Sequence, residues 1–401
     1  MKNKIVHIAF YWLVNLCRLL LSVTFIFSGF VKAVDPLGML YKLNAYFEHW
    51  GIIFLENSLI LKYSVIFMAA VEFILGIYLL LGIRKRFTSA VTLMVMIGMT
   101  MLTVYIYAYN PVADCGCFGE AVTLTNTETL IKNLVLLSAA IVVASFPLYM
   151  KRLISERNQW LTSIFSWVYI ITLGLYSFHY LPVIDFMPFK GGTDIRAAWN
   201  GEAEGQIPEE LMNFALFTAD NSADMTEEVL NDTGYTFLLT MSQVDIADDG
   251  CNDRINDIFD ECSDRNYKFF AVVADHSTEK AINNWIDRTG AAYPFLKCDA
   301  VLIKAMVRSN PGLLLLKDGV IVNKWSNNNL PVLTEDKNWN QLNDKKAVKS
   351  SFMKLLLWFI IPLSVIIVLD GIWIGEKYFK HYIFKRTLKK SIDHEKENCS
   401  R

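Results

Sequence analysis

The sequence carries little charge for its length. Only 19% of its 401 residues are charged, the formal net charge is −2, and 53% of the residues are hydrophobic. This composition departs from that of ordinary soluble proteins and indicates that much of the chain lies in lipid. Without a basic excess, nucleic acid is not an expected partner. The charge is uneven, since residues 185–350 hold 27 acidic against 16 basic residues.

The sequence also lacks several motifs. It contains no Cys-x-x-Cys pair, no internal repeat, and neither inverted halves nor interrupted apolar segments. The last absence gives transport little support. The loop that holds Cys115 and Cys117 has no histidine and no third cysteine, so a metal site is the weakest interpretation of that pair, and no metal is predicted.

Six segments are long and apolar enough to span a bilayer, which takes about 20 helical residues. They are residues 8–31, 63–83, 88–109, 129–149, 160–181 and 352–374. We expect the first to be retained, because its apolar stretch is long and no small-residue cleavage site follows it.

Four clusters of basic residues flank these spans, and all four fall on one side. They are Lys2, Lys4, Arg84, Lys85, Arg86, Lys151, Arg152, Arg157 and the group from Lys377 to Lys390. Because basic residues collect in cytoplasmic loops, both termini are predicted to be cytoplasmic, in the inner membrane of a bacterium. Residues 32–62, the loop with Cys115 and residues 182–351 then face the periplasm.

The run Asp114-Cys115-Gly116-Cys117-Phe118-Gly119 is the most informative part of the chain. Two thiols one residue apart can close a strained disulfide that exchanges electrons with other thiols. A helix starting near Thr127 directs its positive end outward, where it favours a thiolate, and Lys132 adds a positive charge. The alternative is a disulfide that only pins the loop.

Arg18 and Glu72 are the deepest charges of the first two spans. Counted from the basic flanks at 1.5 Å per residue, their depths are about 21 and 18 Å, so they could form a pair. Such a pair could serve a proton or quinone site. It could equally be structural, or Arg18 could extend to the interface.

Several motifs in the first 150 residues resemble a known family. Arg18-Leu19-Leu20, Phe27-Ser28-Gly29-Phe30-Val31-Lys32, Glu72-Phe73-Ile74-Leu75-Gly76 and Leu80-Leu81-Gly82-Ile83-Arg84 resemble the DoxX superfamily of four-helix membrane proteins. Cys115 to Gly119 with Lys132-Asn133 is similar to its MauE branch, which is implicated in methylamine utilisation and in maturation of a disulfide-rich dehydrogenase. The resemblance implies a thiol redox role.

Residues 185–350 have the composition of a soluble domain. Strands are predicted over 235–241, 268–274, 312–316 and 320–325, and helices over 251–266, 277–288 and 299–307. The order resembles a thioredoxin fold over residues 215–330, which makes Pro311 the candidate cis-proline. Cys251 stands alone at the first helix of this fold, and Asp248, Asp249 and Asp253 oppose its ionisation. We therefore expect a weak nucleophile that pairs with Cys298 or stays free.

The predicted fold class is a multi-domain membrane protein: an all-α DoxX-like four-helix bundle, two further transmembrane helices and an α/β thioredoxin-like domain. The expected divisions are residues 1–150, 151–184, 185–350, 351–375 and a basic tail, 376–401.

This organisation resembles vitamin K epoxide reductase homologues, in which a membrane cysteine pair passes electrons between a soluble thiol domain and quinone. The resemblance implies an oxidoreductase in which Cys115 and Cys117 exchange with a periplasmic thiol or disulfide protein, with quinone as the possible cofactor. The alternative is a non-enzymatic scaffold whose outer domain docks an envelope protein. Membrane lipid is a partner in either case.

Overall fold

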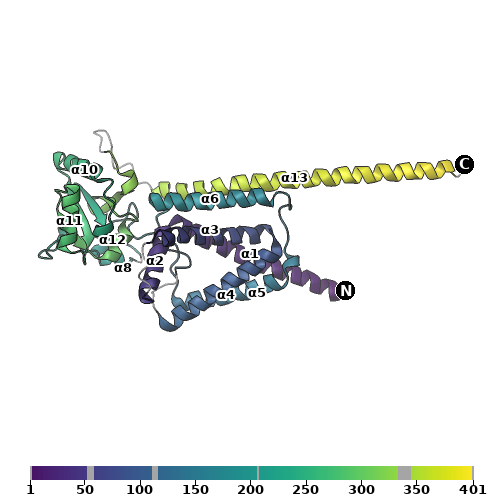
Figure 1. The fold of residues 1–401 in the computed structure, drawn as a ribbon, viewed down its shortest axis with the longest axis horizontal. Helices are drawn as coiled ribbons and strands as arrows, with labels where there is room; N and C mark the ends of the chain where they lie inside the picture. Colours follow the sequence, from purple (N-terminus) through teal and green to yellow (C-terminus); the bar gives the residue numbers. More distant parts are fainter. Residues whose placement is uncertain (1, 52–57, 111–115, 206, 333–344, 400–401) are drawn as a thin grey trace.

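The computed structural model describes residues 2–51, 58–110, 116–205, 207–332 and 345–399. A helical bundle carries a separate sheet domain at one end, and one long helix runs alongside the bundle and past it (Figure 1). The predicted fold class is confirmed: membrane helices are joined to an α/β domain whose sheet has the thioredoxin arrangement.

Within the described residues, six helices are long and apolar enough to cross a membrane, as predicted. They belong to α1 (Lys2–Val34), α3 (Leu59–Leu81), α4 (Lys85–Tyr109), α5 (Asn126–Ser145), α6 (Gln159–His179) and α13 (Lys345–Cys399). A shorter helix, α2 (Pro36–His49), lies across the end of the bundle nearest the sheet domain (Figure 1). It begins at Pro36 because proline suits the first helical position, and Asp35 caps it by accepting a hydrogen bond from the Gly38 amide.

Helices α1 and α3 pack closely because small residues line their contact. A Cβ atom on Gly29 would lie 2.4 Å from the Phe73 backbone nitrogen, and one on Gly76 would lie 2.6 Å from the Ile26 nitrogen. Such close backbone approach is the usual role of small residues between membrane helices.

The two ends of the bundle differ in chemistry. One end, here called the basic end, holds Lys85 and Lys151; Lys85 donates a hydrogen bond to the Met150 carbonyl, and the Leu153 amide bonds the Leu81 carbonyl at 3.0 Å. The opposite end, here called the outer end, holds α2, the segment from Gly116 to Ala121 and the sheet domain (Figure 1).

The sheet domain contains six strands in the order β1-β4-β3-β2-β5-β6. They are β1 (Phe217–Thr218), β2 (Tyr235–Met241), β3 (Lys268–Ala274), β4 (Phe295–Cys298), β5 (Gly312–Lys317) and β6 (Val320–Ser326). Strands β2, β3 and β4 are parallel, whereas β5 and β6 form an antiparallel hairpin beside β2. The hairpin turns at Asp318-Gly319, both with positive φ, as the Asp-Gly step predicts.

Helices cover both faces of this sheet because its strands alternate two sets of apolar side chains. Phe237 and Leu239 of β2 face a core with α10 (Asn252–Asp264) and α11 (Glu279–Thr289). Leu238 faces the other core, with α12 (Ala300–Met306). The remaining short elements are α7 (Ile195–Trp199), α8 (Glu209–Met212), α9 (Thr226–Leu230), η2 (Pro147–Tyr149), η3 (Val244–Ile246) and η4 (Asn327–Asn329).

Candidate thiol site at the outer end of the bundle

The Cys-Gly-Cys-Phe-Gly segment enters the outer end of the bundle as a tight turn. Gly116 and Gly119 have φ of 66° and 56°, and the Gly119 amide donates to the Gly116 carbonyl at 3.0 Å. Both glycines are therefore required by the left-handed backbone. Cys117 is buried, with 8% of its surface exposed. Cys115 lies outside the described residues, so its thiol is placed here by sequence alone.

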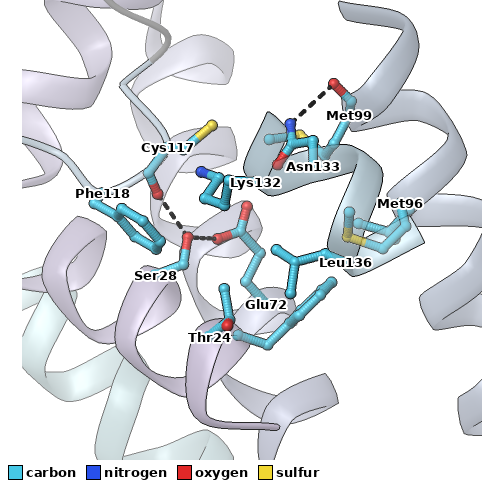
Figure 2. A pocket seen from close by; sticks show the side chains of 12 residues that line it. Thr24, Ser28, Glu72, Met96, Met99, Cys117, Phe118, Lys132, Asn133 and Leu136 are labelled. Carbon is cyan, nitrogen blue, oxygen red and sulfur yellow. Dashed lines mark hydrogen bonds between the residues drawn. The ribbon is translucent and has the colours of Figure 1, made fainter. Parts of the chain in front are cut away.

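A serine connects this turn to a buried ion pair. Ser28 Oγ on α1 lies 2.7 Å from the Cys117 carbonyl oxygen and 2.7 Å from Glu72 Oε2 on α3. Glu72 in turn accepts hydrogen bonds from Lys32 Nζ, at 2.7 and 2.8 Å. Figure 2 shows the Ser28 hydroxyl between the Cys117 carbonyl and the Glu72 carboxylate. Ser28 thus links the turn to the Lys32–Glu72 pair, which among the described residues is the only ion pair between α1 and α3.

The pairing of Arg18 with Glu72 that the depth count allowed does not form, and Arg18 extends to the end of the bundle, the alternative that the sequence left open. Arg18 donates instead to the Lys151 carbonyl at the basic end. The prediction measured depth from Lys4, but α1 extends past its neighbours at its N-terminus (Figure 1), so Arg18 lies much closer to the bundle edge than that count gives. Lys32, 14 residues and about 21 Å further along α1, is the residue that meets Glu72.

Lys32 is the residue of this candidate site to which the sequence analysis assigned no role. Its side chain is 2% exposed, and burial of a lysine is costly unless it is paired and hydrogen-bonded. The signal was available, because Ser28 and Lys32 are four residues apart and therefore share one face of α1. The predicted first span ends at residue 31, however, so Lys32 was assigned to the outer segment 32–62 and not to the bundle.

Lys132 lies beside the cysteine turn, as the sequence suggested. Its Nζ atom is 4.2 Å from the centre of the Phe118 ring, and it lines the same cavity as Cys117 (Figure 2). The Phe118 ring also packs against Phe27 of α1, with ring centres 5.4 Å apart. The Lys132 ammonium therefore adds positive charge near the Cys117 segment. Its contact there is with the Phe118 ring.

The cavity beside the turn has a volume of about 30 Å³. Ser28, Glu72, Cys117, Lys132 and Asn133 supply its polar lining. A water molecule needs roughly 10–15 Å³ of such volume and two or more polar partners, so one water fits. A quinone ring does not. The site can therefore hold a proton carrier between Glu72 and the cysteine segment, but a larger electron acceptor would have to bind elsewhere.

In the sheet domain, Cys251 sits where a thioredoxin fold carries its first cysteine, at the N-terminal cap of α10. Burial, with Asp248 and Asp249 adding to it, raises the pKa of Cys251 to about 11. Its thiol is therefore protonated near neutral pH and is a weak nucleophile.

The other two cysteines of this domain are buried and inert. Burial raises the pKa of Cys262 and of Cys298 to about 12. Cys251 and Cys262 pack with one core of the sheet, whereas Cys298 belongs to the other core. The pairing of Cys251 with Cys298 that the sequence left open is excluded, because the sheet separates them and all three cysteines are thiols.

The Asn310–Pro311 peptide bond is cis, the isomer predicted from the sequence. Its loop adjoins the Cys251 loop, since the Asp248 amide donates to the Asn310 carbonyl at 3.1 Å. The cis-proline loop therefore lies beside the loop that precedes α10, which holds a single cysteine.

A buried ion-pair cluster joins the sheet domain to the cysteine turn. Arg308, just before the cis-proline loop, contacts Asp35 at 3.1 Å and Glu120 at 3.8 Å. Glu120 is three residues after Cys117 and also lies 3.5 Å from Lys42 of α2. The side chains of Arg308 and Asp35 are 6% and 4% exposed, so this ion pair is buried within the interface between the sheet domain and the bundle. No pattern in the sequence predicts this cluster, because its members are up to 273 residues apart.

The described residues contain no group of three or more His, Cys, Asp or Glu side chains that could hold a metal ion. What the geometry offers is a thiol, a buried carboxylate with its ammonium partner, and room for water.

Fold and site together define a multi-pass membrane protein with a thioredoxin-like domain. Residues 10–146, which contain the cysteine turn, Glu72 and Lys132, match the family described as Methylamine utilisation protein MauE. No curated protein matches the chain.

Two solved structures are similar to the sheet domain. One is a solution structure described as a thioredoxin from Neisseria meningitidis, with 12% identity and a TM-score of 0.23, covering 35% of this chain and 87% of that one. The other is described as a protein disulfide isomerase from Bacteroides thetaiotaomicron, with 16% identity and a TM-score of 0.21, covering 36% and 84%.

Proposed function

We propose that this chain is a membrane thiol-redox protein in which Cys115 and Cys117 exchange disulfides with proteins at the outer end. The observation that supports this most is the Ser28 contact between the Cys117 carbonyl and the buried Lys32–Glu72 pair. A loop that only needed pinning would not require a buried ion pair, which is costly in a membrane and is a mark of functional sites there.

In the proposed exchange, the Cys115–Cys117 disulfide oxidises the client protein. A thiolate of the client attacks one sulfur of the Cys115–Cys117 disulfide, and the burial of Cys117 directs the attack to Cys115. A mixed disulfide forms and Cys117 leaves as the thiolate. The second client thiol then displaces Cys115, so the client gains a disulfide and the pair is left as a dithiol.

Reoxidation requires that two electrons and two protons leave the pair, and quinone is the proposed acceptor, becoming quinol. An apolar groove of about 320 Å³ between α1, α3, α6 and α13 has the size for such a ring. Phe27 lines this groove and also contacts Phe118, so the groove and the cysteine turn share one aromatic contact. Glu72, together with a water that the adjacent cavity has room for, is proposed to pass the two protons from the thiols to the quinone.

The sheet domain is proposed to position the client. Its Cys251 has a pKa of about 11 and no second cysteine beside it in an exchange motif, so docking suits it better than catalysis. Arg308 and Asp35 fix it at the outer end beside Glu120, within three residues of Cys117.

The proposed setting is the inner membrane of a bacterium, with the basic end and both termini in the cytoplasm. The outer end then faces the periplasm, where disulfides persist and where the proposed partner is a thiol or disulfide protein of the envelope.

A scaffold without redox activity is the second candidate, because the raised pKa of Cys251 leaves the sheet domain without a reactive thiol of its own. Substituting Cys115 and Cys117 together with serine separates the two. Loss of client oxidation at normal protein abundance supports the redox function. Unchanged client oxidation with reduced abundance shows that the pair only stabilises the fold.

A further inference from the structure

A second cavity, distinct from the thiol site, lies between the bundle and the sheet domain. Its volume is about 360 Å³, within the range of roughly 300–1,000 Å³ that small-molecule sites occupy. Helices α2, α3 and α6 form one side of it, and the loops around the cis-proline and η4 form the other. Figure 1 shows this junction, where α2 meets the sheet domain.

The cavity is lined by an excess of positive charge. Lys62 of α3 and Lys304 of α12 both line it, and among the described residues no carboxylate lies within 4.0 Å of either ammonium. Arg308 also lines it but is already paired with Asp35. Asp248 is the one acid of the lining, and its carboxylate accepts hydrogen bonds from the Gly250 amide and from Asn327. Two lysines are therefore available to an anion.

An unsatisfied acceptor also lines the cavity. Asn310 donates its Nδ2 group to the Gln243 carbonyl at 2.8 Å, whereas its Oδ1 atom is buried and has no hydrogen-bond partner. Leaving a buried acceptor unpaired is unfavourable, so a ligand with an N–H or O–H donor would be stabilised there. The lining is therefore complementary to a molecule that carries a negatively charged group and a hydrogen-bond donor.

The position of the cavity indicates where such a molecule comes from. Lys62 is in the first turn of α3, and the exposed tyrosines Tyr63, Tyr176 and Tyr180 surround this end of α3 and α6. Exposed aromatic residues at helix ends mark the depth of lipid headgroups. The cavity thus opens at the level of the phosphate groups of a membrane leaflet.

We infer that this cavity binds the phosphate of a phospholipid headgroup. Lys62 and Lys304 hold the phosphate, and Asn310 Oδ1 accepts a hydrogen bond from the headgroup alcohol or ammonium. Phosphatidylglycerol and phosphatidylethanolamine carry such a donor and phosphatidylcholine does not, so the site distinguishes them. This inference does not depend on the proposed redox function.

The test is native mass spectrometry of the full chain released from nanodiscs that contain equal amounts of phosphatidylglycerol and phosphatidylcholine. The wild type is expected to retain phosphatidylglycerol in preference. The double variant Lys62→Gln/Lys304→Gln is expected to retain about tenfold less, the loss that corresponds to about 1.4 kcal/mol of binding energy. The control is Lys280→Gln, an exposed lysine of α11, which should match the wild type.

Competition with glycerol 3-phosphate identifies the source of the phosphate. Retention that persists in its presence supports a lipid headgroup, whereas displacement at millimolar concentration supports the same phosphate site filled by a soluble molecule. Equal retention by the double variant and the control, with neither phosphate source bound more tightly by the wild type, would overturn the inference.

Discussion

The cysteine turn of the membrane bundle and the Cys251 loop of the sheet domain are built for different tasks. Beside Cys117 lie a buried carboxylate, its lysine partner and space for water. Cys251 is partly buried and has acids beside it, and burial first and the acids second raise its pKa to about 11. On the proposed function, the thioredoxin-like fold does not carry the exchange chemistry, since function resides in the site and not in the fold that holds it. The reactive thiols are expected in the membrane part.

The largest effect on activity should come from removing one cysteine in each region and comparing the two variants. Cys117→Ser is expected to abolish client oxidation and quinol formation, because the disulfide cannot close. Cys251→Ser is the matched control in the sheet domain and should retain activity within about twofold. The measurement is quinol formation by membrane vesicles given a reduced client protein. A loss in the Cys251 variant equal to that in the Cys117 variant would reverse the comparison.

The buried pair should be the next most sensitive feature. Glu72→Gln leaves Lys32 buried without a counter-charge, which destabilises a protein by roughly 3–5 kcal/mol. Thermal unfolding in detergent measures this loss. The double variant Lys32→Met/Glu72→Gln removes both charges and should recover most of the stability without recovering quinol formation. Recovery of both would show that the pair is structural only.

Packing of α1 on α3 can be disturbed separately from the chemistry. Gly29→Ala would bring a Cβ atom to 2.4 Å from the Phe73 nitrogen, so the helices must separate, at a cost of about 1–3 kcal/mol. Gly98→Ala, in α4 of the same bundle, meets no atom within 4 Å and serves as the control. Thermal unfolding of the two variants gives the comparison. Equal midpoints would show that the close approach contributes nothing.

The junction between the regions should respond to Arg308→Met. Asp35 then remains buried without its partner, which weakens the contact between the sheet domain and the bundle. Limited proteolysis of the variant should cleave the chain between the bundle and the sheet domain faster than in the wild type. Arg288→Met, which removes a half-exposed pair with Asp249 inside the sheet domain, should leave cleavage there unchanged.

The smallest effect concerns the pH dependence of Cys251. Because its pKa is raised, its alkylation rate should keep rising with pH up to about 11, where the thiolate becomes the dominant form. Asp248→Asn removes a negative charge that opposes ionisation, so the pKa falls and alkylation at pH 8 becomes faster. Burial remains the larger cause, so the increase should be modest. An unchanged rate profile would mean that the acids near Cys251 do not act on it.

The sequence predicted most of the fold because each element carries a local signal. The six membrane helices follow from apolar length, and the strands over 235–241 and 268–274 follow from apolar runs between turn residues. These helices and strands depend on residues that are neighbours in the chain. The cis isomer at Pro311 was instead implied by the resemblance of the element order to a thioredoxin fold.

The site was harder to predict because its contacts join distant elements. Glu72 was recognised as a costly buried charge, but its partner depends on where α1 enters the bundle, which the basic flanks placed incorrectly. Arg308 and Asp35 show no pattern at all in the sequence, since only the folded chain brings α12 against α2. Local periodicity determines elements, whereas charge pairs between elements depend on their register and placement.

The most direct test of the central claim is the reduction potential of the Cys115–Cys117 pair in intact membranes, measured by differential thiol labelling across redox buffers. The account predicts a reversible transition near or above about −200 mV, the range of catalytic thiol proteins. A pair that stays oxidised below about −300 mV would be a structural bridge and would contradict the account.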